Sequence, residues 1–161
     1  MSNTFTKIHL KIPHFEQEQN GSCLPACARM ILDSLAITKT EAEIRKLLKT
    51  KPAGTNPLNI ANLKELDIEI KVTFSSLDEL LDHLKSKLPS IALLWTGEIN
   101  YWDSNLYFDY LHAVVVVGFD KENIFVNDPA FSNYPQKIPY IYFLNAWSYS
   151  QHMLILLKRS E

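Results

Sequence analysis

The chain has 161 residues, a net charge of −2 and 47 % apolar residues. This length is typical of one domain, and this apolar share is enough for a buried core. Like charges form no long block, which argues against a nucleic-acid-binding arm and a polybasic membrane patch. We therefore interpret residues 1–161 as a single domain that binds no nucleic acid, while a neutral peptide remains open as a partner.

The sequence also predicts the compartment. Met1 to Thr6 is polar and lacks the apolar centre of a signal peptide. The longest apolar run, Ala113 to Phe119, is far too short to cross a bilayer. We expect a cytoplasmic protein without membrane insertion. Two cysteines four residues apart are not a disulfide framework, so in that reducing compartment Cys23 and Cys27 are expected to be free thiols.

Helices dominate the first half of the chain. Apolar residues that recur at three and four positions predict a helix from Cys23, with Pro25 in its first turn. Thr40 and Glu43 form a capping box, and Thr55 or Asn56 can cap a third helix. The expected elements are a half-exposed strand at 7–12, a loop at 14–22, and helices at about 23–35, 41–49 and 57–66.

Strands dominate the second half. The alternating and continuous apolar runs predict strands at 68–74, 90–95, 112–119, 124–127 and 151–158. A helix is expected from a cap at Ser76 to about Lys87, a turn at 120–123 and a loop at 130–138, while 140–147 is compatible with helix or strand. Because strict alternation of strand and helix is missing, the fold class is α+β, with N-terminal helices packed on a mainly antiparallel sheet.

The stretch from Gln17 to Cys27 carries the first chemical signal. Cys23 opens a predicted helix, and a thiol at a helix N-terminus lies where backbone N–H groups and the helix dipole favour its anion. A thiolate in such a place is a nucleophile. Cys27, one turn later on the apolar stripe, is expected in the core, and two cysteines with one histidine are weak evidence for zinc.

A cysteine nucleophile needs a base, and His112 is the best placed of the five histidines. It begins an apolar strand that would hold it rigidly. Asp128 ends the next strand across the hairpin, so the two side chains can meet and the carboxylate can orient the ring. Gln17 can supply an amide donor to the oxyanion, beside the backbone N–H of Cys23.

These residues resemble the signature of a known family. Gln17, Cys23 and the following Pro-Ala resemble the nucleophile region of papain-like peptidases. The segments 112–119 and 126–129 resemble the second half of the signature of bacteriocin-processing cysteine peptidases, which cut leaders after a double glycine, and of their stand-alone relatives. The resemblance implies a papain-like fold with Cys23 as nucleophile, His112 as base, Asp128 as orienting group and Gln17 as oxyanion donor.

This chain differs from the family pattern at the two positions beside Cys23. Transporter-linked members of that family usually carry an acidic residue before the cysteine and a glycine after it, whereas this chain has Ser22 and Leu24. The family's fold and chemistry therefore carry over better than its leader-peptide specificity.

Several residues have a simpler interpretation beside the catalytic one. Cys23 could be a buried small residue, His112 a core histidine and Asp128 a turn residue before Pro129. Asn127 is a substitute orienting group. Trp147 is interpreted as core, and the four remaining histidines as surface or edge residues: His9, His14, His83 and His152. The aromatic residues of 95–110 (Trp95, Tyr101, Trp102, Tyr107, Phe108 and Tyr110) are interpreted mainly as packing, with a cleft wall as the alternative.

The sequence thus predicts a cysteine peptidase that hydrolyses a peptide or protein substrate and needs no metal or organic cofactor. Loops 49–57 and 96–110 would set its specificity. Two other functions use the same residues. An acyltransferase would pass the acyl group from Cys23 to an amine, and an inactive papain-like module would only bind a peptide or partner protein.

Overall fold

The computed structural model describes residues 6–103 and 108–161, so the predictions for Met1 to Phe5 and for Tyr107 lie outside the described residues. Within those two ranges a seven-stranded sheet has the order β2-β7-β3-β4-β5-β6, with β1 paired to β4, and the neighbours are antiparallel. The strands are β1 Ile8–His9, β2 Ile68–Phe74, β3 Ser90–Trp95, β4 Leu111–Phe119, β5 Asn123–Asn127, β6 Gln136–Pro139 and β7 Met153–Arg159. The predicted α+β class is confirmed.

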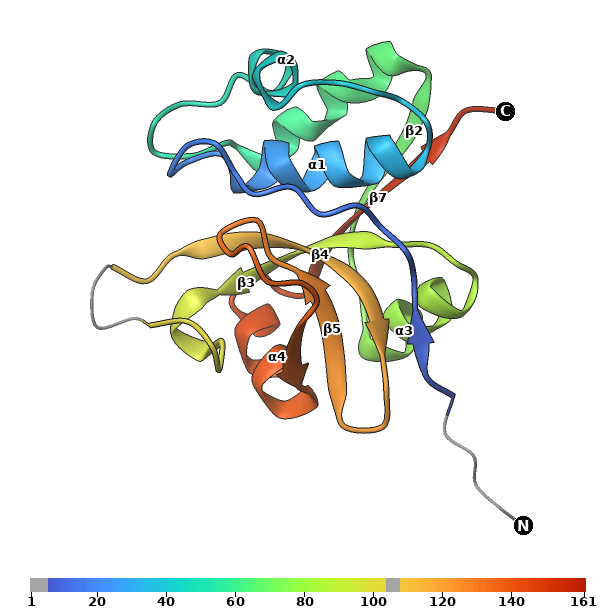
Figure 1. Cartoon of the computed structure of the whole chain (residues 1–161), viewed down its shortest axis with the longest axis vertical. Helices are drawn as coiled ribbons and strands as arrows, with labels where there is room; N and C mark the ends of the chain where they lie inside the picture. Colours follow the sequence, from blue (N-terminus) through green and yellow to red (C-terminus); the bar gives the residue numbers. More distant parts are fainter. Residues whose placement is uncertain (1–5, 104–107) are drawn as a thin grey trace.

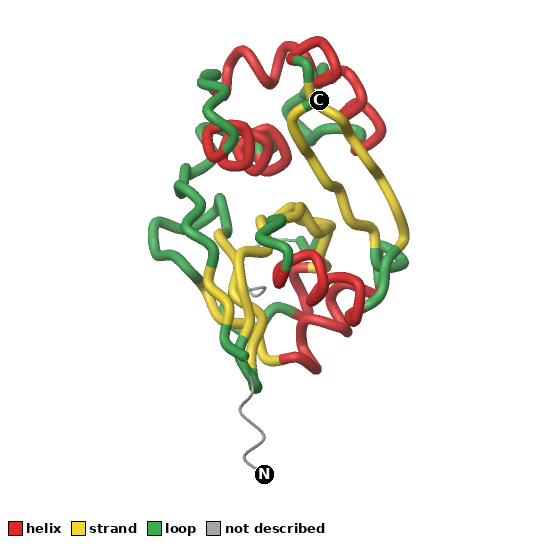
Figure 2. The backbone as a smooth tube through the Cα atoms, turned by 90° about the vertical axis from the view of Figure 1, so that its right-hand side faces the viewer, coloured by secondary structure: helices red, strands yellow, loops and turns green. Residues whose placement is uncertain are grey.

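Helices cover both faces of this sheet. Figure 1 shows α1, α2 and the 3-10 helix η1 on one side and α3 and α4 on the other. Figure 2 shows β2 and β7 as a long ribbon that reaches up to the first group. The helices are α1 Cys23–Ser34, α2 Glu41–Leu47, η1 Pro57–Leu66, α3 Leu77–Lys85, η2 Thr96–Glu98 and α4 Tyr140–Ser148.

Two hydrophobic cores follow from the alternation of side chains along β3 and β4. Ile91 and Val115 belong to the cluster with α1, α2 and η1. Ala92 and Val116, their next neighbours, belong to the cluster with α3 and α4. Because successive strand residues point to opposite faces, two valine-rich strands supply both cores at once. The predicted continuous apolar runs are therefore central strands.

The expected helix starts are confirmed in detail. The Thr40 hydroxyl accepts the Glu43 backbone N–H, and the Glu43 carboxylate accepts the Thr40 backbone N–H. Asn56 caps η1 by accepting the N–H of Leu58. The third predicted helix is thus present, although its turns are of the 3-10 type.

Two sequence predictions need correction, and one open alternative is resolved. The first strand spans only Ile8–His9, because β1 touches the sheet only where it crosses the end of β4. The expected loop at 130–138 ends in β6, an edge strand whose polar sequence and proline hide its pairing with β5. The ambiguous segment 140–147 is helix α4, which buries Phe143 and Trp147. No helix in the described part of the chain is long and apolar enough to cross a membrane.

Candidate active site

Cys23 lies at the open end of α1. Its N-cap residue, Ser22, makes no side-chain cap, and the first turn contains no acidic residue. The Ser22 hydroxyl instead bonds to Glu41 and to the Gln19 carbonyl. Ser22 thus does not cap the first N–H groups of α1, and the positive end of the helix lies at the half-buried Cys23 thiol.

His112 and Asp128 meet across the β4–β5 hairpin. His112 is the second residue of β4, and Asp128 directly follows β5. The ring Nε2 lies 2.6 Å from Asp128 Oδ1, and both side chains are fully buried. A carboxylate at this distance fixes the ring's orientation and leaves Nδ1 for proton exchange. The pairing predicted from the hairpin is therefore present in the structure.

The Asp128 carboxylate has further donors. The Tyr101 hydroxyl donates to Oδ2 at 2.7 Å, and the Ala130 backbone N–H donates to Oδ1 at 2.9 Å. Hydrogen bonds to the ionised form of a carboxylate favour its charge. In return, burial and the Asp128 charge raise the pKa of the Tyr101 hydroxyl far above its ordinary value, so it remains a neutral donor.

The protonation states of Cys23 and His112 are coupled. Burial alone would lower the pKa of His112, but the Asp128 charge and hydrogen bond, together with Cys23, raise that pKa to about 10. Burial opposes the Cys23 thiolate, yet its contact with His112 and the N–H groups of Ala113 and Leu24 lower the thiol's pKa below 9.0. These opposite directions favour a thiolate–imidazolium pair at neutral pH.

His112 Nδ1 is the ring atom that remains for Cys23. It makes no hydrogen bond of ordinary geometry among the described residues, whereas Nε2 is occupied by Asp128. The thiol interacts with the ring closely enough to change both pKa values. Contacts of this kind are often loose without substrate and tighten in the complex.

Aromatic rings surround the imidazole. The Trp102 ring lies 4.8 Å from the His112 ring, and the Tyr110 ring lies 5.8 Å away at 87°. Phe131 packs edge-on against both Tyr101 and Trp102. The aromatic segment before β4 therefore includes residues that wall the candidate site, in addition to packing.

Gln17 lies next to Pro129, which follows Asp128, but its side-chain amide forms hydrogen bonds within its own loop. Its backbone N–H donates to the Pro129 carbonyl at 2.7 Å. The side-chain Nε2 donates to the carbonyls of Gln19 and Asn20 at 2.9 and 3.0 Å. Both amide hydrogens thus hold the turn that leads into Cys23, and Oε1 is buried without a partner.

Contacts between residues 12–17 and residues 127–131 join the two halves of the site. Asn127 donates its amide to the Ile12 carbonyl at 3.1 Å, and His14 Nε2 lies 2.7 Å from the Phe131 carbonyl. The Asn127 amide therefore bonds to the Ile12 backbone and not to His112, and Asp128 is the residue that contacts the His112 ring. The His14 ring also stacks on Tyr134, so His14 is half-buried rather than a surface residue.

A buried carboxylate supports the loop before Cys23. Glu41, only 1 % exposed, accepts the Glu18 backbone N–H and the Ser22 hydroxyl, and it pairs with Arg45 at 2.9 Å. Gly21 lies against the next loop so closely that a Cβ there would be 2.5 Å from the Pro52 carbonyl oxygen. The position of Cys23 thus depends on two contacts beyond α1.

Sequence reasoning did not single out Tyr101 or Glu41. Tyr101 belongs to a segment without clear periodicity, and only the crowding of aromatic residues before His112 pointed to it. Glu41 sits inside a capping-box motif, which explains an acidic residue in the first turn without any tertiary role.

The remaining candidates are structural. Cys27 is fully buried, and burial together with the Cys23 and Asp128 charges raises the pKa of its thiol well above 9.0. Trp147 is core as predicted, and His152 stacks on it at 4.4 Å, half-buried rather than at the surface. The described parts of the chain contain no group of three His, Cys, Asp or Glu side chains placed to hold a metal ion.

Comparisons with known proteins bear on the family and the fold of this chain. The model of the peptidase C39 family matches residues 11–161. A C39-like peptidase from Bacillus anthracis has a TM-score of 0.77 at 20 % identity, covering 97 % of this chain and 100 % of that one. The peptidase domain of Streptococcus ComA, a bifunctional ABC transporter, has a TM-score of 0.75 at 20 % identity, covering 93 % and 100 %.

A third structure holds a peptide. It is a double glycine motif protease from an AMS/PCAT transporter, solved in complex with the leader peptide. Its TM-score is 0.73 at 20 % identity, covering 96 % of this chain and 99 % of that one. At this identity the likeness establishes the fold. No curated protein matches the chain.

Proposed function

This chain belongs to the peptidase C39 family, and we propose that it is a cysteine peptidase in which Cys23, His112 and Asp128 form the catalytic triad. The observation that carries the proposal is the 2.6 Å contact between buried His112 and Asp128, with the Cys23 thiol beside the free ring nitrogen. A cysteine nucleophile requires this order of thiol, base and orienting carboxylate.

In the proposed reaction the Cys23 thiolate attacks the carbonyl carbon of the scissile peptide bond. The His112 imidazolium then donates its proton to the leaving amine, which departs and leaves a thioester on Cys23. Neutral His112 next removes a proton from water, the hydroxide attacks the thioester, and the acid product leaves. Asp128 keeps Nε2 engaged throughout, so Nδ1 is the nitrogen that carries the proton.

The oxyanion of each tetrahedral intermediate needs donors. The open N–H groups at the start of α1 are suitable, because Ser22 does not cap them. We propose that Gln17 is a second donor and exchanges one of its bonds to the Gln19 and Asn20 carbonyls for the oxyanion. Those bonds are solvent-exposed, so breaking one costs little, whereas a lost oxyanion donor typically costs about 100- to 1,000-fold in turnover.

Leader-type peptides are the proposed substrate class. The support is the likeness to the double glycine motif protease that was solved with a leader peptide. The two residues beside the nucleophile, Ser22 and Leu24, are both buried, so they shape the loop and the core rather than contact a substrate directly.

A peptide library tests the proposal. Wild-type protein and the Cys23→Ala variant are incubated with peptides that include double-glycine sequences, and the products are identified by mass spectrometry. We expect cleavage by the wild type only. Added amine nucleophiles distinguish hydrolysis from acyl transfer by the mass of the product. A wild-type protein that binds peptides but leaves all of them intact would show that this chain is a binding module.

A further inference from the structure

A second hollow lies at the other end of α1. It has a volume of about 320 Å³ and is bounded by the end of α1, the chain after β1, the turn before β3 and the end of β7. At about 1.5 Å per residue, its lining residues Ile31 and Leu35 lie about 12 Å and about 18 Å along the helix axis from Cys23. This groove is therefore separate from the candidate active site.

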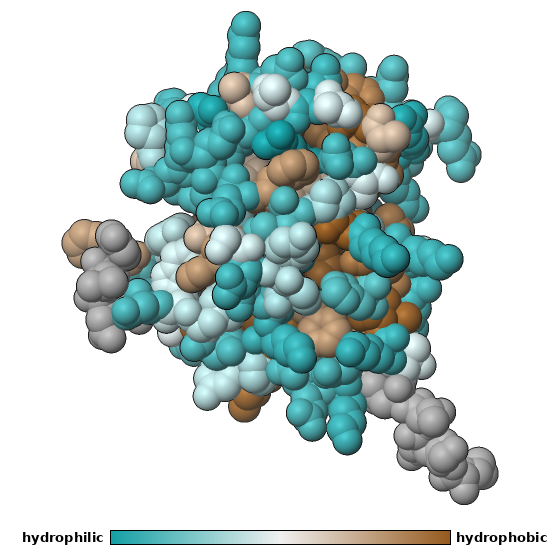
Figure 3. Space-filling view, in the orientation of Figure 1, coloured by the Kyte–Doolittle hydropathy of each residue, from teal (hydrophilic) through white to brown (hydrophobic). Residues whose placement is uncertain are grey.

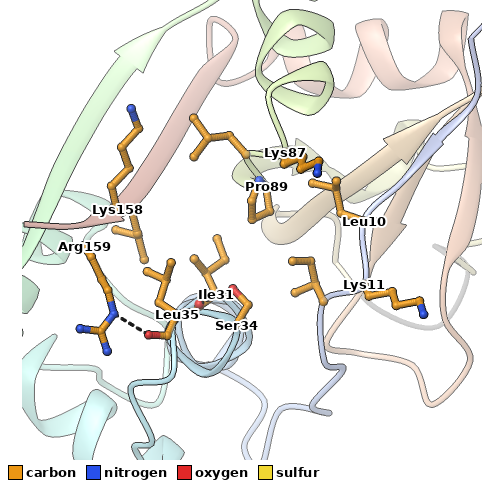
Figure 4. Close-up of a pocket in the computed structure, with 12 residues that line it drawn as sticks. Leu10, Lys11, Ile31, Ser34, Leu35, Lys87, Pro89, Lys158 and Arg159 are labelled. Atoms are coloured by element: carbon orange, nitrogen blue, oxygen red, sulfur yellow. Dashed lines mark hydrogen bonds between the residues drawn. The ribbon is translucent and has the colours of Figure 1, made fainter.

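The interior of the groove is apolar. Ile31 and Leu157 are buried there, and Leu10 and Leu35 are half-buried. Figure 4 shows the labelled aliphatic side chains turned toward the hollow. The single hydroxyl of the lining, that of Ser34, already donates to the Ile31 carbonyl at 2.6 Å. The side chains of the interior thus offer no free donor to a ligand.

The rim of the groove is cationic. The lining residues include Lys11, Lys87, Lys158 and Arg159, all exposed, and contain no acidic residue. Two of these cations lie on one side of the hollow and two on the other (Figure 4). The ion pairs found among the described residues involve none of them. Arg159 donates Nε to the Leu35 carbonyl at 2.7 Å, which leaves its other N–H groups available.

This arrangement is unusual for the chain as a whole. The protein carries 18 acidic and 16 basic side chains, yet the charged residues that line this hollow are all basic. Figure 3 shows hydrophobic side chains gathered where α1 meets the sheet on the side of β1, with hydrophilic groups around them. An apolar interior and a positive rim complement a molecule with an alkyl body and an anionic head.

We propose that this groove binds a medium-chain fatty acid, with its alkyl chain on the apolar interior and its carboxylate among the rim cations. An extended peptide fits less well, because its backbone N–H and C=O groups would meet no side-chain partners there. The volume of the hollow is at the lower end of small-molecule sites.

Calorimetric titration with decanoate below its aggregation concentration tests the proposal. We expect saturable binding of one molecule per chain. Decanol, which has the same chain without the charge, should bind at least tenfold more weakly. The double variant Lys87→Glu/Lys158→Glu should lose at least tenfold in decanoate affinity, because the carboxylate would face two anions. A matched control, Lys51→Glu/Lys121→Glu, makes the same change in net charge on exposed lysines outside the groove.

Three results would overturn the proposal. These are no saturable binding of decanoate, equal loss of affinity in the test and control variants, and sedimentation with anionic phospholipid vesicles without binding of monomeric decanoate. The last result would assign the patch to a membrane surface. Circular dichroism confirms that both double variants are folded before titration. Because the Cys23→Ala variant should bind decanoate as the wild type does, failure of the peptidase proposal leaves this one standing.

Discussion

Cys23 and Cys27 are one helical turn apart and carry the same side chain, yet their surroundings are opposite. Cys23 lies half-buried at the uncapped start of α1, beside a buried histidine. Cys27 is fully enclosed by the apolar residues between α1 and the sheet. The pKa of the first thiol is lowered and that of the second is raised well above 9.0.

The difference shows which neighbours govern a thiol in this fold. Both sulfur atoms lose solvation, and that loss alone raises both pKa values. Only Cys23 has an imidazolium and backbone N–H donors to offset it, and the Cys23 and Asp128 charges disfavour a second anion at Cys27. We therefore expect the reactivity of the Cys23 thiol to depend on its pairing with His112.

The largest expected effect is on alkylation. Iodoacetamide at pH 6 should label the wild-type protein and the Cys27→Ala variant at one residue, and the Cys23→Ala variant should remain unlabelled. The physical reason is that a thiolate is the reacting species, and the pKa of Cys23 is lowered whereas that of Cys27 is raised. Intact-mass spectrometry measures the labelling. Label on Cys27 in the wild type would contradict the comparison of the two thiols.

Replacing the orienting carboxylate comes next. Asp128→Ala should lower kcat/KM by on the order of 1,000-fold, because the His112 ring loses its partner. It also leaves the Tyr101 hydroxyl and the Ala130 N–H without their acceptor, so it should lower stability as well. Asp128→Asn separates these effects, since its amide oxygen still accepts a hydrogen bond. A normal rate in folded Asp128→Ala would remove Asp128 from the triad.

The pH dependence of alkylation separates the effect of His112 on the Cys23 pKa from that of the helix N-terminus. The ion pair exists between the lowered pKa of Cys23 and the pKa of about 10 of His112. The alkylation rate of the wild type should therefore vary less between pH 6 and 8 than that of a thiol with the ordinary pKa of 9.0. In His112→Ala the pKa of the Cys23 thiol should return toward 9.0. The alkylation rate should then fall about tenfold for each pH unit below that pKa. A flat profile in His112→Ala would show that the helix N-terminus alone ionises Cys23.

Much of this site could be predicted because its signals are local. A cysteine before a helix stripe, a histidine at the start of an apolar strand and an aspartate after the next strand are each visible in the printed sequence. The hairpin converts their spacing into contact, since the start of β4 and the end of β5 become neighbours. Cys27 followed from its position on the buried stripe of α1.

The unpredicted contacts join segments far apart in the chain. Tyr101 reaches Asp128 over 27 residues, and the Asn127 amide reaches the Ile12 carbonyl over 115. Neither bond follows from periodicity or turn chemistry, because both depend on how loops fold over the sheet. The same reason explains β6, whose pairing with β5 outweighs a polar sequence that resembles a loop.

Removal of the Tyr101 hydroxyl tests how far the pairing of Cys23 with His112 depends on the hydrogen bond from Tyr101 to Asp128. Tyr101→Phe deletes a 2.7 Å bond to Asp128 and leaves the ring in place. A hydrogen bond to a charged group contributes about 1.5–3 kcal/mol, so kcat should fall by about 10- to 150-fold with little change in KM. The second readout is the pH profile of alkylation, because a change in how Asp128 supports the His112 charge would alter it, whereas a loss of packing alone would not. An unchanged kcat and an unchanged profile would reduce Tyr101 to a packing residue.

The smallest expected effect concerns Cys27. Cys27→Ala removes one fully buried sulfur atom and leaves a small cavity between α1 and the sheet. The free energy of unfolding should fall by about 1–2 kcal/mol, which urea denaturation measures, while the alkylation rate of Cys23 stays within about twofold. Cys27→Ser is the matched variant, because it keeps the size but buries a hydroxyl, and it should be no more stable than Cys27→Ala. A large change in Cys23 reactivity in either variant would show that the core thiol, and not His112 alone, tunes the nucleophile.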